Sequence, residues 1–444
     1  MIVEIMDEAA FLYPYYLAHP HVCTDSRQVE KGDLFFALSG PRFDGNAFAL
    51  SALDAGASYA VVSSKEIAGS DDRCLYVPDT LLALQALARH HRMQLDLPVM
   101  AITGTNGKTT TKELTKAVLS RKYRLLATEG NLNNHIGVPL TLLRLTKEHE
   151  MALVEMGASA PGEIAFLCDI ARPTAGLITN VGKAHLEGFG SIEGVLKTKS
   201  ELPDFLSSND GDFFLNADDP RLFDKWSFFA RMCYGIQKEK EPDVTCEILS
   251  DHPYLRLEII GKEGHQTVNT HLTGRYNYQN VLAASSVGLH FGVRLTDIRS
   301  AIESYYPSNS RSQVITFERG ITVVMDAYNA NPSSMMAALT NLDSLEADTK
   351  IAILGDMLEL GEASESEHRV ITEWLEKHPD IRPYLCGEAF QQAAGDRFQV
   401  FPDSGELASA VAGIDLPDGA CILIKGSRGI ALESVLTTIQ ERFK

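Results

Sequence analysis

Apolar positions along the chain form short runs and stretches of helical spacing, and these group into three segments. In residues 1–85 the runs at 33–38, 59–64 and 74–78 predict strands, which glycine and proline turns separate. Leucines and alanines then recur at helical spacing over 81–94. We therefore expect a small α/β N-terminal domain and a helix that leads out of it.

A second segment, 86–306, alternates predicted strands with helical stretches. Its apolar runs lie at 99–103, 152–156, 176–181 and 212–216. Strands and helices in this order form a parallel sheet with both faces covered. We expect a central α/β domain built on such a sheet.

The third segment, 307–444, opens with the polar, turn-rich sequence PSNSR at 307–311. Predicted strands follow at 321–326, 350–355, 398–401 and 420–426, with helices between them. This pattern is typical of a doubly wound unit, so the C-terminal domain is expected to be Rossmann-like. The chain is thus predicted to be an α/β protein of three domains.

Composition and charge narrow the possible partners. The 444 residues are 45% hydrophobic, which is enough to bury several cores. The formal net charge of −19 disfavours nucleic acid, because phosphate backbones bind basic surfaces. A site for a small anion would need local donors, such as backbone N–H groups and a helix N-terminus, that act against the overall field.

The number of cysteines and the N-terminal sequence indicate the cellular compartment. The seven cysteines are odd in number and form no CxxC pair, which argues against disulfides and favours a reducing compartment. The N-terminal stretch is acidic and lacks a basic region, so it is not expected to be a signal peptide. No apolar run approaches the length of a membrane span. We expect a soluble, cytoplasmic protein.

The strongest chemical signal is the sequence AITGTNGKTTTKE, in which strand, glycine turn, Lys, Thr and helix follow in the order of a phosphate loop. Gly104 and Gly107 would let phosphate oxygens approach the backbone. Lys108 is placed to reach the β- and γ-phosphates, and the hydroxyl of Thr109 to hold Mg²⁺. The standard motif has a glycine where this chain has Ile102, so a tight strand-to-helix turn without a ligand is the alternative.

Two residues beyond this loop are candidate metal ligands, because phosphoryl transfer requires neutralisation of charge. Glu155 ends a predicted strand, where a carboxylate would point into the crevice of a parallel sheet. His185 follows another strand, whereas Lys199, in a helical stretch, carries no signal by itself. Position alone leaves plainer alternatives open: a solvated carboxylate, a surface histidine and a helix-surface lysine.

Taken together, the motifs resemble the Mur ligase family, the ATP-dependent amide ligases of peptidoglycan synthesis. The loop GTNGKTT, without the early glycine, is that family's form, and the resemblance covers nearly the whole chain. The N-terminal sequence TDSR resembles the family's uridine-nucleotide site. Several strings are most similar to the member that joins D-alanyl-D-alanine to UDP-N-acetylmuramoyl-tripeptide: EGNLNNHIGVPLTLL (129–143), EMGAS (155–159), DAYNANPSSM (326–335), LGDMLELGE (354–362) and KGSR (425–428).

The resemblance implies roles for individual residues. Expected catalytic residues are Lys108, His185, Lys199 and Asp326. Two Mg²⁺ ions are expected at Thr109, Glu155, His185 and Lys199, the last as a carbamate formed with CO₂. ATP is expected to contact Gly104, Thr105, Asn106, Gly107, Lys108, Thr109, Thr110, Asn277, Asn280, Arg311, Tyr328, Asn329 and Asn331. The uridine part of the substrate is expected at Thr24, Ser26 and Arg27 in a UDP-binding N-terminal domain, beside a P-loop ATPase-like central domain.

The implied reaction phosphorylates the tripeptide's terminal carboxylate with ATP, and the amine of D-alanyl-D-alanine then attacks the acyl phosphate. Because acyl phosphates hydrolyse in water, we expect the third domain to close over ATP, with 307–311 as the hinge. The chain is expected to act as a monomer. Two alternatives stay open: another amide ligase on the same scaffold, such as a different Mur ligase or one that extends a folate polyglutamate tail, and a nucleotide-binding module without catalysis.

Overall fold

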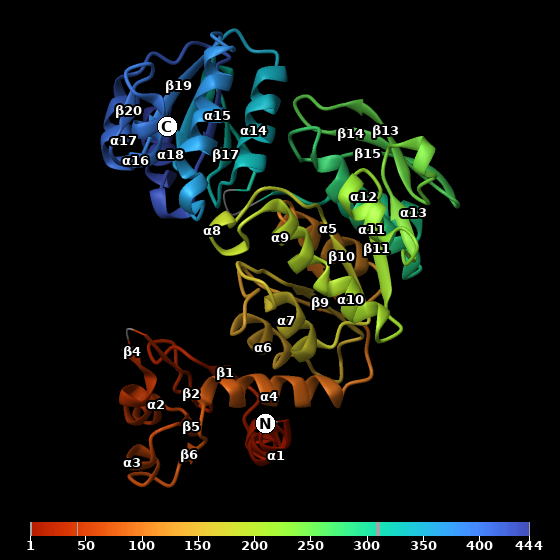
Figure 1. Ribbon diagram of the computed structural model, residues 1–444, viewed down its shortest axis with the longest axis vertical. Helices are drawn as coiled ribbons and strands as arrows, with labels where there is room; N and C mark the ends of the chain where they lie inside the picture. Colours follow the sequence, from red (N-terminus) through yellow and green to blue (C-terminus); the bar gives the residue numbers. More distant parts are fainter. Residues whose placement is uncertain (1, 42, 308–310, 444) are drawn as a thin grey trace.

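The computed structural model describes residues 2–41, 43–307 and 311–443, with side chains from residue 8 onward. Three units follow one another along the longest axis (Figure 1): an N-terminal unit in red to orange, a central unit from orange through yellow to green, and a C-terminal unit in cyan to blue. The predicted three-domain α/β architecture is therefore present. The boundaries after residues 85 and 306 stay predictions, and residues 308–310 of the expected hinge lie outside the described residues.

The N-terminal unit is a parallel sheet with strand order β1-β2-β5-β6. Its strands are β1 (Val22–Cys23), β2 (Leu34–Phe36), β5 (Tyr59–Val62) and β6 (Cys74–Tyr76). Smaller elements are β3 (Ser39–Gly40), β4 (Phe43–Asp44), η1 (Gly45–Phe48), α2 (Ala49–Ala55) and α3 (Lys65–Ala68). The predicted runs at 33–38, 59–64 and 74–78 each contain one of these strands, which confirms them.

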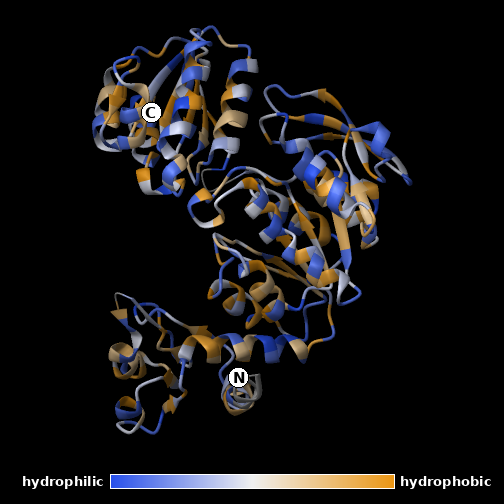
Figure 2. Ribbon diagram, viewed as in Figure 1, coloured by the Kyte–Doolittle hydropathy of each residue, from blue (hydrophilic) through white to orange (hydrophobic). Residues whose placement is uncertain are grey.

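Helix α4 (Thr80–Met93) confirms the helical spacing predicted for 81–94. Asp79 caps its first turn by accepting hydrogen bonds from the N–H groups of Leu81 and Leu82. Its buried side chains Leu84 and Leu87 belong to a core that also includes strands of the N-terminal and central sheets. Along α4, hydrophobic and hydrophilic residues are both present (Figure 2), as its position between two units requires.

Arg92 fastens the end of α4 to the central unit. Its side chain is only 6% exposed and donates hydrogen bonds to the carbonyl oxygens of Leu95 (2.8 Å), Leu97 (3.1 Å) and Ala171 (3.2 Å). Burial lowers the pKa of this guanidinium. A buried cation that satisfies several carbonyl groups holds α4 in one position.

The central unit has a parallel sheet with strand order β12-β11-β10-β7-β9-β8. Alternate residues of β7 supply the two cores: Val99 and Ala101 face one side, Met100 and Ile102 the other. The strands are β7 (Val99–Thr103), β8 (Leu125–Ala127), β9 (Met151–Glu155), β10 (Ala175–Ile178), β11 (Asp212–Asn216) and β12 (Met232–Tyr234). The predicted strands at 99–103 and 212–216 coincide with β7 and β11, and the two others overlap β9 and β10.

Helices cover both faces of this sheet. They are α5 (Lys108–Leu119), α6 (Gly137–Leu142), α7 (Glu163–Ala171), α8 (Leu186–Phe189), α9 (Ile192–Lys199), α10 (Glu201–Ser207), α11 (Pro220–Trp226), η2 (Lys238–Lys240), α12 (Asn277–His290) and α13 (Leu295–Glu303). A small antiparallel sheet of β13 (Thr245–Ser250), β14 (Arg256–Gly261) and β15 (Gly264–Asn269) extends the unit. Neither this sheet nor the N-terminal helix α1 (Ile2–Ala18) was predicted.

The C-terminal unit is a doubly wound sheet with strand order β16-β17-β21-β18-β19-β20. Its strands are β16 (Gln313–Thr316), which is antiparallel, and β17 (Thr322–Asp326), β18 (Lys350–Gly355), β19 (Ile381–Cys386), β20 (Val400–Phe401) and β21 (Cys421–Lys425). Its helices are η3 (Glu318–Gly320), α14 (Pro332–Ser344), η4 (Gly361–Ala363), α15 (Ser364–Glu376), α16 (Glu388–Ala394), α17 (Ser404–Gly413), η5 (Arg428–Ile430) and α18 (Glu433–Arg442).

The neighbours β17, β21 and β18 are parallel, so the loops that follow them meet at one edge of the sheet. The four strands predicted in this segment are confirmed, and β16 and β19 add to them. Among the described residues, no helix combines the length and apolar character that crossing a bilayer requires.

Replacing Arg92 with leucine is expected to lower the free energy of unfolding by about 2–4 kcal/mol, because buried carbonyl groups lose their charged donor. Chemical denaturation followed by circular dichroism measures the change. Arg89→Leu is the matched control, since Arg89 is partly exposed and makes a surface ion pair with Asp169; its effect is expected to stay below about 0.5 kcal/mol. Equal losses of unfolding free energy in the two variants would contradict the anchoring role assigned to Arg92.

Candidate active site

A cavity of about 760 Å³ lies between the central and C-terminal units. This volume suits a substrate or nucleotide, because ligand pockets typically measure about 300–1,000 Å³. Its lining comes from both units and includes these predicted residues: Thr105, Asn106, Gly107, Lys108, Thr109, Thr110, Glu155, His185, Asn277, Asn280, Arg311, Asp326, Tyr328, Asn329 and Asn331. The fold thus brings most of the predicted ATP and metal residues to one place.

The loop between β7 and α5 has the backbone geometry of an anion site. Gly104 has φ 144° and Gly107 has φ 77°, values that L side chains rarely adopt. Gly107 is the N-cap of α5 and leaves that position without a side chain, so the first N–H groups of the helix face the cavity. The helix N-terminus adds its partial positive charge.

Side-chain amides hold this loop in shape. The N–H of Asn106 donates to Oδ1 of Asn180 (3.0 Å), and its carbonyl oxygen accepts from Oγ1 of Thr179 (2.6 Å) and Nδ2 of Asn180 (3.1 Å). From the C-terminal unit, Nδ2 of Asn331 donates to Oδ1 of Asn106 (2.8 Å). The loop is therefore fixed by both units.

Lys108 is a cation without an acidic partner. Among the described residues its Nζ donates only to the carbonyl oxygens of Gly104 (2.8 Å) and Thr105 (3.2 Å), and no carboxylate lies within ion-pair distance. Burial lowers the pKa of Lys108, the charge of Arg311 lowers it further, and Glu155 opposes both. An arriving phosphate would supply the missing negative charge.

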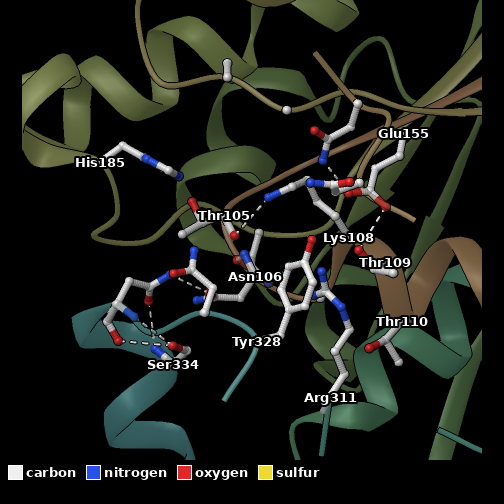
Figure 3. Close-up of a pocket in the computed structure, with 18 of the residues that line it drawn as sticks. Thr105, Asn106, Lys108, Thr109, Thr110, Glu155, His185, Arg311, Tyr328 and Ser334 are labelled. Atoms are coloured by element: carbon white, nitrogen blue, oxygen red, sulfur yellow. Dashed lines mark hydrogen bonds between the residues drawn. The ribbon is translucent and has the colours of Figure 1, made fainter. Parts of the chain in front are cut away.

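Thr109 and Glu155 provide oxygen atoms of the kind that Mg²⁺ prefers. Oγ1 of Thr109 donates to Oε2 of Glu155 (2.9 Å), and Nδ2 of Asn133 donates to Oε1 (2.8 Å). The carboxylate of Glu155 is 2% exposed. Figure 3 shows Lys108, Thr109 and Glu155 together on the loop side of the cavity. Among the described residues, no group of three or more His, Cys, Asp or Glu side chains is placed to hold a metal ion.

His185 contacts the C-terminal unit. It has a left-handed backbone (φ 48°), and its Nδ1 lies 2.6 Å from Oε2 of Glu359. Burial lowers the pKa of His185, whereas the carboxylate of Glu359 acts in the opposite direction. A carboxylate at Nδ1 leaves Nε2 as the nitrogen for a metal.

Lys199 ends α9 as an isolated buried amine. Its side chain is 2% exposed, and among the described residues it makes no hydrogen bond or ion pair; Nζ lies 5.6 Å from the centre of the Phe189 ring. Burial, followed by the charge of Lys108, lowers the pKa of Lys199 to about 7. A large fraction of this amine is therefore neutral and nucleophilic near neutral pH.

The wall of the cavity that the C-terminal unit provides is polar, and its side chains contact one another. The guanidinium of Arg311 lies 3.7 Å from the centre of the Tyr328 ring (Figure 3), close enough for a cation–π contact. Asp326 accepts hydrogen bonds from Nζ of Lys425 (2.6 Å) and from the N–H of Ser312 (3.0 Å). Asp326 is thus paired with a cation of its own domain.

Asn277 and Asn280 are buried against the phosphate loop. Oδ1 of Asn280 accepts from Oγ1 of Thr111 (3.0 Å), and its Nδ2 donates to Oδ1 of Asn277 (2.7 Å). Nδ2 of Asn277 donates to the carbonyl of Thr273 (2.7 Å). These bonds tie α12 to α5 at the wall of the cavity.

The remaining predicted residues are not among those that line the cavity. Gly104 and Lys199 belong to the central unit, Gly104 next to the lining residue Thr105. Thr24, Ser26 and Arg27 belong to the N-terminal unit, where Arg27 is bound to Asp25 through Nε (2.9 Å) and NH2 (2.7 Å). Sequence analysis did not single out Asn133, Asn180, Glu359, Lys425 and Arg428, which also line the cavity. Glu359, Lys425 and Arg428 lie within the strings LGDMLELGE and KGSR, so the resemblance had marked their segments but not their roles.

Three domain models of one family match successive parts of the chain. The Mur ligase family catalytic domain matches residues 20–92, the Mur ligase middle domain 102–288, and the Mur ligase glutamate ligase domain 310–428. Curated relatives include the UDP-N-acetylmuramoyl-tripeptide–D-alanyl-D-alanine ligases of Bacillus subtilis (34% identical) and Escherichia coli (35% identical). In both comparisons the match covers 95% of this chain and 93% of the relative.

Solved structures agree with these matches. A crystal structure of MurF from Acinetobacter baumannii superposes with a TM-score of 0.85 at 32% identity, covering 95% of this chain and 93% of the other. MurF ligase from Thermotoga maritima, in complex with ADP, gives 0.83 at 29% identity and covers 96% and 98%. With matching domains in the same order and relatives that cover nearly its full length, this chain belongs to the Mur ligase family.

Proposed function

We propose that this enzyme uses ATP to join D-alanyl-D-alanine to UDP-N-acetylmuramoyl-tripeptide, with release of ADP and phosphate. The observation that carries the proposal is the cavity in which a phosphate loop with an unpaired lysine faces a polar C-terminal surface. The curated relatives named for this reaction match 95% of the chain, which favours it over other amide ligases and over a non-catalytic nucleotide-binding module.

The first step activates a carboxylate, because hydroxide leaves too slowly for an amine to displace it. The terminal carboxylate oxygen of the tripeptide attacks the γ-phosphorus of ATP, and the bond to the β–γ bridging oxygen breaks. Lys108 and the N–H groups at the start of α5 stabilise the charge that develops on the phosphate oxygens. ADP remains on the loop and the acyl phosphate forms beside it.

Mg²⁺ is proposed at two positions, one beside Thr109 and Glu155 and one that also draws on His185. Glu155 is buried and His185 has a free Nε2, so both side chains fit such ligation. When bound, the ions neutralise the negative charge of the phosphates. Asn133 and Glu359 hold the two side chains in place.

Lys199 is proposed to react with CO₂ to form a carbamate. Supporting this, its buried amine has no partner among the described residues and a pKa of about 7. The neutral amine nitrogen would form a bond to the carbon of CO₂ and lose one proton, which gives a carbamate anion; a lysine that starts as the ammonium form would first lose another proton. An oxygen-bearing anion suits Mg²⁺ far better than an ammonium group does.

The second step forms the amide. The amine of D-alanyl-D-alanine attacks the acyl carbon, the bond to phosphate breaks, and the nitrogen loses its proton. Asp326 was expected to be catalytic; its ion pair with Lys425 at the wall of the cavity favours a positioning role instead.

The N-terminal unit is proposed to bind the uridine diphosphate part at Thr24, Ser26 and Arg27. The substrate would then extend from this unit toward the cavity, along the axis on which the units are arranged (Figure 1). We propose that the chain acts as a monomer, because one chain supplies both walls of the cavity, and in the cytoplasm, where ATP is available.

Release of ADP in a coupled assay is expected only when ATP, UDP-N-acetylmuramoyl-tripeptide and D-alanyl-D-alanine are all present. Lys108→Ala should lower kcat by at least about 10²-fold, because the cation that stabilises the transferred phosphoryl group is lost. Lys116→Ala is a matched control on the same helix, at a residue that does not line the cavity. Turnover with L-glutamate in place of the dipeptide would contradict the proposal.

Carbamate formation is expected to depend on pH with a known sign. Lys199 reacts with CO₂ only as the neutral amine, so a carbamate signal in ¹³C NMR with labelled bicarbonate should grow as pH rises through about 7 and fade below it. Lys199→Ala should lack this signal and lose at least about 10²-fold in kcat. A wild-type spectrum without the signal at pH 8 would contradict the carbamate while leaving the ligase function intact.

A further inference from the structure

The cavity contains a cation that the reaction described so far does not use. Among the described lining residues, the lysines and arginines are Lys108, Arg311, Lys425 and Arg428. Lys425 is paired with Asp326 at 2.6 Å. Lys108 belongs to the phosphate loop, and Arg311 is close enough for its charge to act on Lys108. The side chain of Arg428 makes no ion pair or hydrogen bond within the described chain.

Arg428 projects from a well-fixed base. In the loop after β21, the N–H of Ser427 donates to the carbonyl of Asp356 (3.1 Å), and its Oγ accepts from the N–H of Leu358 (2.9 Å). Lys425, at the end of β21, is held by Asp326. These bonds join the loops after three neighbouring strands, so the backbone of Arg428 is held at the edge of the sheet that borders the cavity.

The guanidinium groups of two arginines, Arg311 and Arg428, both lie near the ring of Tyr328. The guanidinium of Arg311 lies 3.7 Å from the centre of that ring, and that of Arg428 lies 5.6 Å from the same centre. Of the two, Arg311 is the one whose charge perturbs Lys108. Arg311 and Arg428 therefore share the Tyr328 ring, and the charge of Arg311 acts on the lysine of the loop between β7 and α5.

The incoming dipeptide has the matching chemistry. Its amine must stay unpaired to attack, so its terminal carboxylate is the charged group left for the enzyme to bind. A guanidinium binds a carboxylate through two parallel hydrogen bonds, which fixes direction as well as position. An extended dipeptide spans about 7 Å, so a carboxylate held at Arg428 leaves the amine at the other end of the dipeptide free to reach the acyl phosphate in the same cavity.

We propose that Arg428 binds the terminal carboxylate of the incoming dipeptide and thereby aims its amine at the acyl phosphate. The assignment rests on the proposed function and adds a specificity determinant to it. It accounts for a free cation held at a fixed point of a cavity in a strongly acidic protein. It also implies that a dipeptide without a negative C-terminus is a poor substrate.

Steady-state kinetics with D-alanyl-D-alanine and with its uncharged C-terminal amide test the proposal. In the wild type the amide should show a KM about 10- to 100-fold higher than the acid. Arg428→Gln should raise the KM for the acid by a similar factor, leave that for the amide nearly unchanged, and leave the KM for ATP unchanged. Arg428→Lys should be intermediate, because it keeps the charge and loses the paired geometry.

Arg382→Gln, at an exposed arginine on β19 outside the cavity, is the control and should keep both KM values. ADP binding and thermal unfolding show whether each variant is folded. If Arg428→Gln does not fold, Arg428→Lys replaces it in the kinetic comparison. An unchanged preference for the acid in the Arg428 variants would overturn the inference while the ligase function stands. A wild type that makes no product from either dipeptide would instead refute the proposed function.

Discussion

The hydrogen bonds that Asn106 makes with Thr179, Asn180 and Asn331 keep the loop between β7 and α5 open toward the cavity. A phosphate site made of backbone donors needs N–H groups that no other protein atom occupies, yet the loop must not collapse. Side-chain amides meet both needs, because they bind the flanks of the loop and leave the start of α5 free. Nearly every other feature of the site is arranged around this loop.

The distribution of charged side chains around the cavity follows from the same need to bind phosphate. In a chain with a net charge of −19, an anionic substrate is attracted only if cations are concentrated locally. Within the described chain, Lys108, Arg311 and Arg428 reach the cavity without carboxylate partners, whereas Asp326 is paired with Lys425. The carboxylate of Glu155 accepts hydrogen bonds from the neutral side chains of Thr109 and Asn133, which suits the metal site proposed there. An acidic chain can thus bind an anion where lysine and arginine side chains without carboxylate partners face the cavity.

Much of this arrangement was predictable because it is local in sequence. The strand β7, the glycine turn and Lys108 follow one another within ten residues, so pattern alone located the phosphate loop. The outer strands β13–β15 were missed because their residues alternate weakly, with glutamates and glycines among half-buried positions. The long helix α1 was missed because β-rich runs dominate the segment that follows it.

Contacts between distant segments were beyond sequence reasoning. Asn331 and Asn106 are 225 positions apart, and the pair His185–Glu359 joins two domains, so no spacing rule relates them. The isolation of Lys199 is likewise a property of packing, since a lysine in a helical stretch is normally solvated. The family resemblance supplied these residues as candidates, except Glu359, which only the fold reveals as the partner of His185.

The antiparallel strand β16 has a consequence for how the enzyme is switched on. Arg311 lies just before β16, and among the described strands β16 pairs with β17 alone, so this arginine is carried on the C-terminal unit although its charge acts on Lys108 in the central unit. If the C-terminal unit tilted away, as the expected closure over ATP implies, it would withdraw this positive charge from the nucleotide together with one wall of the cavity. The electric field at the γ-phosphate would then depend on the position of the C-terminal unit, and hydrolysis of ATP in an open form would lack this cation.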